Sequence, residues 1–451
     1  MKVAVILLGI FTLYLCVDLG RVFKRRINKE YLRHAWKKTA IWLLGMQLAV
    51  IFITYVSSQL QVSIAFGIYL IATAQALIGI TIFTTTLNNL RKVRSGHVKL
   101  LVSEKDLPTV TVCIPARNET QDLLECLQSL VSSTYPKLEI LVLDDCSQER
   151  RTSEIIRCFA QQGVRFIAGK NPPDKWLAKN YGYDQMADEA NGDFLLFCGV
   201  DSRFQPDTIT QLVKLMLQNK RSMLSVIPKN VLKPGLSFGQ SLIQPSRYAW
   251  ELALPRDLAK RPPVLSTCWI ITKQTLAGAG GFEAISKKTV PESYFVRLAA
   301  KQGDYSFITS NSLIGLTCTK SIAEQRSTAI RTRYPQLHRR PELVALVSLA
   351  ELTQLVLPII FFVTSILTSN VLLFSLSTLS MTFNLLAYSK IVNLTYRRFL
   401  VAGLFALPVA AIYDICLLNY SMWQYEFGEV VWKDRNICVP VMQVIPELPK
   451  I

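Results

Sequence analysis

The chain of 451 residues is 50% hydrophobic and has a mean hydropathy of +0.28, which is high for a protein that lies wholly in water. Its 50 lysines and arginines outnumber 32 aspartates and glutamates, for a formal net charge of +18. The basic residues lie beside apolar runs, as at the cytoplasmic ends of membrane helices, so we expect a membrane partner and no nucleic acid. Ten cysteines without a Cys-x-x-Cys pair, and only three histidines, argue against a zinc site or a disulfide framework.

Residues 1–95 are expected to form an N-terminal membrane region of about three spans. The first apolar run, Val3–Val17, is followed by the basic segment 21–38. A signal peptide carries its charge before the apolar run, so we favour a retained anchor over a cleaved signal. Two longer runs, Ala40–Val56 and Val62–Phe83, are of spanning length, for which about 20 residues are needed. With 21–38 as a cytoplasmic loop, the chain that follows the third run is cytoplasmic as well.

Residues 108–319 have the pattern of a soluble α/β domain. Four short β-rich runs are separated by segments in which apolar residues recur at helical spacing, which is typical of a parallel sheet covered by helices on both faces. The four predicted strands are Thr109–Ile114, Glu139–Leu143, Val164–Ala168 and Phe194–Cys198.

The remainder of the chain returns to the membrane. Residues 320–342 are basic and poor in apolar residues, which indicates a helix lying at the headgroup level. Residues 343–420 hold two or three further spans, and residues 421–451 form a tail. The number of C-terminal spans stays open because polar residues and prolines interrupt the runs: Glu351, Pro358, Pro408 and Asp414.

Four polar segments follow the predicted strands or open the next helix, where ligands bind in open α/β sheets. Each has a bland alternative as a helix start or helix cap. They are Pro115-Ala116-Arg117-Asn118-Glu119, Asp144-Asp145, Asp174 to Asn180, and Gly199-Val200-Asp201.

In this order and spacing the four segments resemble those of membrane-bound, inverting family-2 glycosyltransferases, which include ceramide glucosyltransferases and enzymes that glycosylate carotenoid or hopanoid-type lipids. The resemblance covers about residues 108–333, and Val431-Trp432-Lys433-Asp434-Arg435 resembles the Trp-Lys-Gly-Arg segment found after the last membrane helix. It implies an α/β fold of the glycosyltransferase-A, Rossmann-like type, in a cytoplasmic domain flanked by transmembrane helices. It also implies a nucleotide-sugar partner, linked to UDP or GDP, and a lipid acceptor.

The resemblance also assigns residues. Those matching the donor-binding motifs are Pro115, Arg117, Asn118, Glu119, Asp144, Asp145, Lys175 and Asn180. Those on the acceptor or diphosphate side are Gln325, Arg326, Arg333, Tyr334, Trp432, Lys433 and Arg435.

Two departures from the family pattern affect the chemistry. The first metal-binding aspartate is Gly199 here, so Asp201 is the remaining candidate ligand for a magnesium or manganese ion. The position of the general base is Ser293, which is too weak a base at neutral pH without an activating group. The adjacent Glu292 is the candidate catalytic base, with a structural role as helix cap as its alternative.

These features predict an inverting glycosyltransferase that moves a sugar from a nucleotide-sugar donor to a membrane lipid at the cytoplasmic face, in a multi-pass membrane protein. Asp201 and Glu292 are its predicted catalytic residues. The alternative is a non-catalytic relative that keeps the fold as a nucleotide-sugar-binding scaffold, since both departures fall on catalytic positions. A processive polysaccharide synthase is a third, less favoured interpretation.

Overall fold

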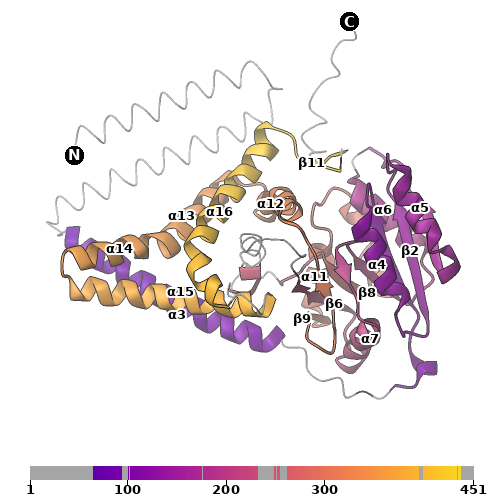
Figure 1. Cartoon of the computed structure of the whole chain (residues 1–451), viewed down its shortest axis with the longest axis horizontal. Coiled ribbons are helices and arrows are strands. Elements are labelled where there is room, and N and C mark those ends of the chain that lie inside the picture. Colours follow the sequence, from indigo (N-terminus) through magenta and orange to yellow (C-terminus); the bar gives the residue numbers. More distant parts are fainter. Residues whose placement is uncertain are drawn as a thin grey trace, which may run out of the picture.

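The computed structural model describes residues 64–93, 100, 102–174, 176–231, 248–249, 251–253, 262–395, 400–433 and 435–437. The spans predicted before residue 57, the basic loop 21–38 and Lys175 lie outside the described residues. Figure 1 shows an α/β domain on one side and a group of long helices on the other.

The α/β domain is built on a seven-stranded sheet with the strand order β3-β2-β1-β4-β8-β6-β9. Its strands are β1 (Val110–Ala116), β2 (Leu138–Asp144), β3 (Val164–Ala168), β4 (Phe194–Cys198), β6 (Met223–Ile227), β8 (Cys268–Thr272) and β9 (Tyr305–Thr309). All four strands predicted from the sequence are present within one or two residues, and they are mutually parallel. A small second sheet joins β5 (Ser202–Arg203), β10 (Thr317–Cys318) and β7 (Lys229–Asn230).

The sheet is mixed, which corrects the prediction of a parallel one. Strand β8 lies between β4 and β6 and runs antiparallel to both, while β6 and β9 are parallel to each other. The alternation of strand and helix that indicates parallel pairing ends after β4. The sequence therefore did not indicate the direction in which β6, β8 and β9 pair.

Helices cover both faces of the sheet. One apolar core packs α4 (Gln121–Val131), α5 (Arg150–Cys158) and α7 (Thr208–Gln218) against one face. A second core packs α6 (Ala178–Glu189), α10 (Lys273–Gly278) and α11 (Glu292–Lys301) against the other. Successive strand residues alternate between the two cores, as Leu195 and Leu196 of β4 do. Short 3-10 turns lie at Glu104–Asp106, Ala160–Gln162 and Glu283–Ile285.

The long helices are α3 (Ile64–Val93), α13 (Pro341–Glu351), α14 (Leu357–Leu367), α15 (Val371–Thr395) and α16 (Leu400–Phe427). A π-helical turn, Leu352–Val356, joins α13 to α14. Within the described residues, three helices are long and apolar enough to cross a membrane: Ala65–Val93, Pro341–Leu367 and Val371–Leu394.

The sheet packs directly against this group of helices. Val93 of α3 and Ile391 of α15 share an apolar cluster with Ile227 of β6 and Phe307 of β9. Helix α12 (Ile322–Gln336) follows β10 and begins with a capping box between Ser321 and Glu324. After α16, strands β11 (Val431–Trp432) and β12 (Arg435–Asn436) form a hairpin beside the α/β domain (Figure 1).

Candidate active site

A cavity of about 630 Å³ lies at the carboxyl ends of β1 and β4. Its walls come from the loops after these strands, from the first turns of α6 and α11, from one face of α12 and from the β11 hairpin. Among the residues predicted for a site, seven line it: Pro115, Glu119, Asn180, Asp201, Glu292, Trp432 and Lys433. Segments far apart in the sequence therefore converge on the sheet edge where ligands bind in α/β folds.

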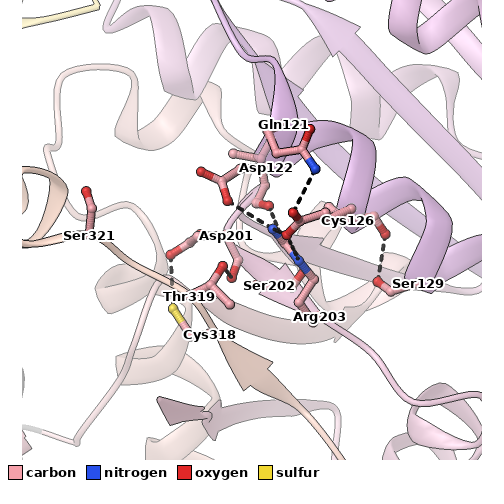
Figure 2. Close-up of polar contacts among 12 residues, drawn as sticks. Gln121, Asp122, Cys126, Ser129, Asp201, Ser202, Arg203, Cys318, Thr319 and Ser321 are labelled. Carbon is pink, nitrogen blue, oxygen red and sulfur yellow. Dashed lines mark hydrogen bonds and ion pairs between the residues drawn. The ribbon is translucent and has the colours of Figure 1, made fainter. Parts of the chain in front are cut away.

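Asp201 is held in a tight loop directly after β4. Its backbone carbonyl accepts a hydrogen bond from the N–H of Thr319 at 3.0 Å. Its carboxylate accepts one from the thiol of Cys318 at 3.2 Å, as Figure 2 shows. Nearby, Arg203 donates to the Val200 carbonyl and forms ion pairs with Asp122 and Glu125 of α4, which fix the loop to the domain (Figure 2).

Lys320 forms an ion pair with Asp201, with its Nζ 3.2 Å from Oδ2. The lysine side chain is 17% exposed and lines the cavity, whereas Asp201 is almost buried. Burial raises the pKa of Asp201, but the Lys320 ammonium and the Cys318 thiol lower it by more, so this pKa lies below its usual range. Asp201 is therefore an ionised carboxylate at neutral pH, already paired with a cation.

These residues do not fit a divalent cation well. Magnesium and manganese take several oxygen ligands, and one or two carboxylates supply part of the set. Among the described residues there is no group of three or more aspartate, glutamate, histidine or cysteine side chains that could hold a metal ion. Asp201 Oδ2 is shared by a thiol and an ammonium, and that ammonium would repel a dication at the same oxygen.

Glu292 is the second buried carboxylate of the cavity. It lies in the first turn of α11, is 1% exposed, and its Oε2 has no hydrogen-bond partner within the described part of the chain. Ser293 instead donates its hydroxyl to the carbonyl of Val290 at 2.7 Å. Burial raises the pKa of Tyr183 well above its usual value, and the nearby Glu292 and Asp201 raise it further, which keeps this phenol neutral beside both carboxylates.

The loop after β1, which contains Arg117 and Glu119, is joined to the C-terminal hairpin. Arg117 donates to the carbonyls of Asp145 and Cys146 at 2.6 Å each, and to the carbonyl of Lys433 at 2.7 Å. Lys433 forms an ion pair with Glu119 at 2.5 Å. Burial raises the pKa of Glu119, and Lys433 opposes that rise only in part. The hairpin therefore forms a wall of the cavity.

Asn180 anchors the loop that leads to Glu292. Its side-chain amide lies 2.9–3.0 Å from the carbonyls of Ile285, Ser286 and Lys288. Its Oδ1 has no partner among the described residues and lies in a side chain that is 1% exposed.

Several predicted donor-binding residues have local structural contacts outside the cavity lining. Asp144 accepts from the N–H of Ser147 at 3.0 Å, a contact within the turn before α5, whose N-cap is Glu149. Asn118 adopts a left-handed conformation (φ 47°) and accepts from the N–H of Gln148. Asp145 is buried beside it, at the turn that Arg117 binds.

On helix α12 the predicted residues Arg333 and Tyr334 lie on a different face from the residues that line the cavity. Residues Ala323, Ser327 and Arg331, spaced four apart, line the cavity. Arg333 is buried in an ion pair with Asp414 of α16, and the Tyr334 hydroxyl donates to Glu426 of α16 at 2.6 Å. This helix therefore has one face on the cavity and another buried against α16.

Two further predicted residues of α12 also lie away from the cavity. Gln325 is buried and donates to the carbonyl of Lys320, while Arg326 is exposed. The guanidinium of Arg331 lies 4.9 Å from the ring centre of Trp432, so this helix and the hairpin meet over the cavity. Arg435 lies in β12 of the same hairpin.

The sequence analysis missed Lys320, Thr267 and Tyr183, all of which line the cavity. The Thr267 carbonyl accepts from the N–H of Gly199 and the hydroxyl of Ser202, which holds the Asp201 loop in place. Only Lys320 had a signal in the sequence, as a cation directly after a short apolar segment.

The fold and cavity place the domain in the α/β class that binds ligands at the carboxyl ends of its strands. Residues 111–275 match the family described as glycosyl transferase family 2. The chain thus contains a family-2 glycosyltransferase domain, and its mixed sheet is of the glycosyltransferase-A type. Glu292, Lys320 and the hairpin lie beyond the matched residues.

Similar proteins include the probable glycosyltransferase YdaM of Bacillus subtilis, 32% identical over 129 residues, or 28% of this chain and 30% of that protein. The 4,4'-diaponeurosporenoate glycosyltransferase of Staphylococcus haemolyticus is 29% identical over 126 residues, or 28% of this chain and 33% of that one. The chain therefore matches about a third of the length of these relatives. Among solved structures, the Pyrobaculum calidifontis mannosyltransferase PcManGT with GDP-Man and Mn²⁺ is 15% identical. Its TM-score is 0.49, and the match covers 79% of this chain and 99% of that one.

Proposed function

We propose that this protein is an inverting glycosyltransferase that moves a sugar from a UDP- or GDP-linked donor to a membrane lipid at the cytoplasmic face. The observation that carries the proposal is Glu292, a buried carboxylate whose Oε2 has no described partner, in the same cavity as Asp201. Burying a carboxylate without a partner costs free energy, and such groups concentrate at functional sites.

The reaction needs one base and one stabiliser of the leaving group. The acceptor oxygen attacks the anomeric carbon of the sugar and forms the new glycosidic bond, while the bond from that carbon to the diphosphate oxygen breaks. Glu292 accepts the acceptor's proton, and the nucleoside diphosphate leaves as an anion. In-line attack inverts the anomeric configuration. The donor lies against Pro115, Glu119 and Asn180, under the hairpin that carries Trp432 and Lys433.

Three observations support a lipid acceptor. A relative is named for a carotenoid acid, diaponeurosporenoate, and the α/β domain of this chain packs directly against helices α3 and α15. A second cavity of about 390 Å³ lies among the long helices, and its wall is mostly apolar, with Ile82, Leu355 and Ala411 as examples. Such a space suits an acyl or isoprenoid chain next to the domain.

The test is transfer from radiolabelled UDP- and GDP-sugars by the full-length protein in lipid nanodiscs that contain a total lipid extract. We expect Glu292→Gln to lower kcat by about 10²–10⁴-fold, the usual contribution of a general base, with unchanged nucleotide binding. Ser293→Ala is the matched control and retains activity, because the Ser293 hydroxyl donates to the Val290 carbonyl rather than facing the cavity as a lining residue.

Wild-type turnover in Glu292→Gln would contradict the assignment of the base. Nucleotide binding without transfer from any donor would favour the non-catalytic scaffold.

A further inference from the structure

The pair of Lys320 and Asp201 differs from an ordinary surface ion pair in its position. It lies in the loops after β4 and β10, and both of its residues line the cavity. The carboxylate is buried and accepts from Cys318 as well, whereas the lysine faces the cavity. An ammonium has three N–H donors, and the contact with Asp201 uses one. The direction of the other two N–H donors is set by the Lys320 side chain, whose backbone is held between β10 and the capped start of α12.

Gly199 fits this arrangement and opposes a two-aspartate metal site. A Cβ atom at position 199 would overlap the Asp201 Oδ1 atom, because the carboxylate folds back over the glycine. A second aspartate at 199 therefore requires the Asp201 carboxylate, which pairs with Lys320, to shift from this position. Glycine at position 199 leaves room for the Asp201 carboxylate in the position in which it pairs with Lys320.

We propose that the Lys320 ammonium supplies the positive charge that neutralises the diphosphate of the donor, in place of a divalent cation. The inference rests on the proposed glycosyl transfer and specifies how its leaving group is stabilised. Lys320 donates charge-assisted hydrogen bonds to the diphosphate as the bond to the anomeric carbon breaks, and no proton needs to move from the lysine. Asp201 orients the ammonium, and is a positioning residue in this arrangement.

The first experiment is titration of UDP and GDP against the full-length protein in nanodiscs, by calorimetry, with EDTA or with Mn²⁺ or Mg²⁺. We expect the affinity with EDTA to equal the affinity with either metal. Lys320→Met should weaken binding of the diphosphates by roughly ten- to a hundredfold, the loss expected for one charge-assisted hydrogen bond, and leave binding of uridine and guanosine unchanged. Lys320→Arg keeps the charge and should retain most of the affinity.

Two controls separate this role from a structural one. Lys301→Met removes an exposed lysine at the far end of α11 and should change nothing. Asp201→Asn leaves the ammonium in place, so diphosphate binding in EDTA persists. If Asp201 instead held a metal ion, the same variant would lose diphosphate binding in Mn²⁺ or Mg²⁺. The double variant Asp201→Asn with Lys320→Met removes both charges together and avoids a lone buried carboxylate. It should bind diphosphates as weakly as Lys320→Met.

Loss of binding or of transfer in EDTA, with recovery in Mn²⁺ or Mg²⁺, overturns the inference. Wild-type affinity in the double variant also overturns it, because the pair is then only structural. Diphosphate binding without transfer from any donor overturns the proposed function alone. Absence of binding of both UDP and GDP to the wild-type protein overturns the two together.

Discussion

Asp201 and Glu292 are both buried carboxylates of one cavity, but their surroundings give them different chemistry. Asp201 is paired with Lys320 and Cys318, so it is held as an anion that orients a cation. Glu292 Oε2 has no partner in the described chain, which leaves it available to a proton or an incoming hydroxyl. Two acids that differ in this way are typical of sites in which one acts as base and the other has an electrostatic role.

A methyl group at Gly199 should disturb the pair of Asp201 and Lys320. We expect Gly199→Ala to destabilise the protein by about 1–3 kcal/mol, because the new Cβ overlaps the Asp201 carboxylate. Nucleotide diphosphate affinity should fall with it. Thermal unfolding and UDP titration measure both effects. Gly278→Ala is the control, since a Cβ there meets nothing within 4 Å, and an equal loss in that variant would contradict the steric argument.

At the scale of elements, α12 links the cavity to the long helices. One face carries Arg331 to the cavity, and the opposite side buries Arg333 against Asp414 and Tyr334 against Glu426. The C-terminal hairpin closes over the same cavity through Glu119, Lys433 and Trp432. Both elements thus join regions of the chain that are remote in sequence.

The buried pair of Arg333 and Asp414 should matter for stability. Arg333→Met removes the described ion-pair partner of the buried Asp414 and should lower the free energy of unfolding by about 3–5 kcal/mol. Replacing both residues, as Arg333→Met with Asp414→Leu, should recover most of that loss. Thermal unfolding in nanodiscs tests this. A double variant no more stable than the single one would show that the pair contributes more than charge compensation.

Removal of Lys433 should make stability depend on pH. Burial already raises the pKa of Glu119, and Lys433 is the partner that limits the rise. In Lys433→Met the folded-state pKa of Glu119 rises further above its unfolded value. The folded protein then binds a proton that the unfolded chain releases, so stability is highest at low pH and falls as pH rises through the folded pKa.

The measurement is the melting temperature of Lys433→Met at pH 5 and pH 8, relative to the wild type. We expect the difference between variant and wild type to be larger at pH 8. A difference that is larger at pH 5 would contradict this sign.

At the scale of the whole molecule, the α/β domain is fixed to helices α3 and α15 by the cluster of Val93, Ile391, Ile227 and Phe307. Both helices are long and apolar enough to cross a membrane, so this attachment agrees with the proposed lipid acceptor. Helix α5 lies on the side of the domain away from the long helices (Figure 1). It ends at Cys158, an exposed cysteine.

Cys158 therefore reports on which side of the membrane the domain lies. A membrane-impermeant maleimide should label Cys158 only after the cells are permeabilised, because we propose a cytoplasmic domain. The signal is the labelling of the wild type minus that of Cys158→Ser, which removes the contribution of other cysteines. Labelling of Cys158 in intact cells would place the domain outside.

Strands β1 to β4 were predictable because each is a short apolar run whose length and composition are local properties of the sequence. The polar segments at their ends were predictable for the same reason. Strand β8 was identified neither in place nor in direction, since its pairing with β4 and β6 depends on residues far along the chain. The helix at 322–336 was expected, but not which face of it meets the cavity.

The sequence alone indicated the α/β domain, the apolar helices beside it and Asp201 after a buried strand, because these are local patterns of apolar and polar residues. Glu292 was selected by the resemblance to family-2 glycosyltransferases. Only the tertiary structure decided that Lys320 pairs with Asp201, that Arg331 rather than Arg333 meets the cavity, and that Glu292 Oε2 has no described partner. The physical reason is that ion pairs and buried groups are set by distances of a few ångströms between segments that only the folded sheet brings together.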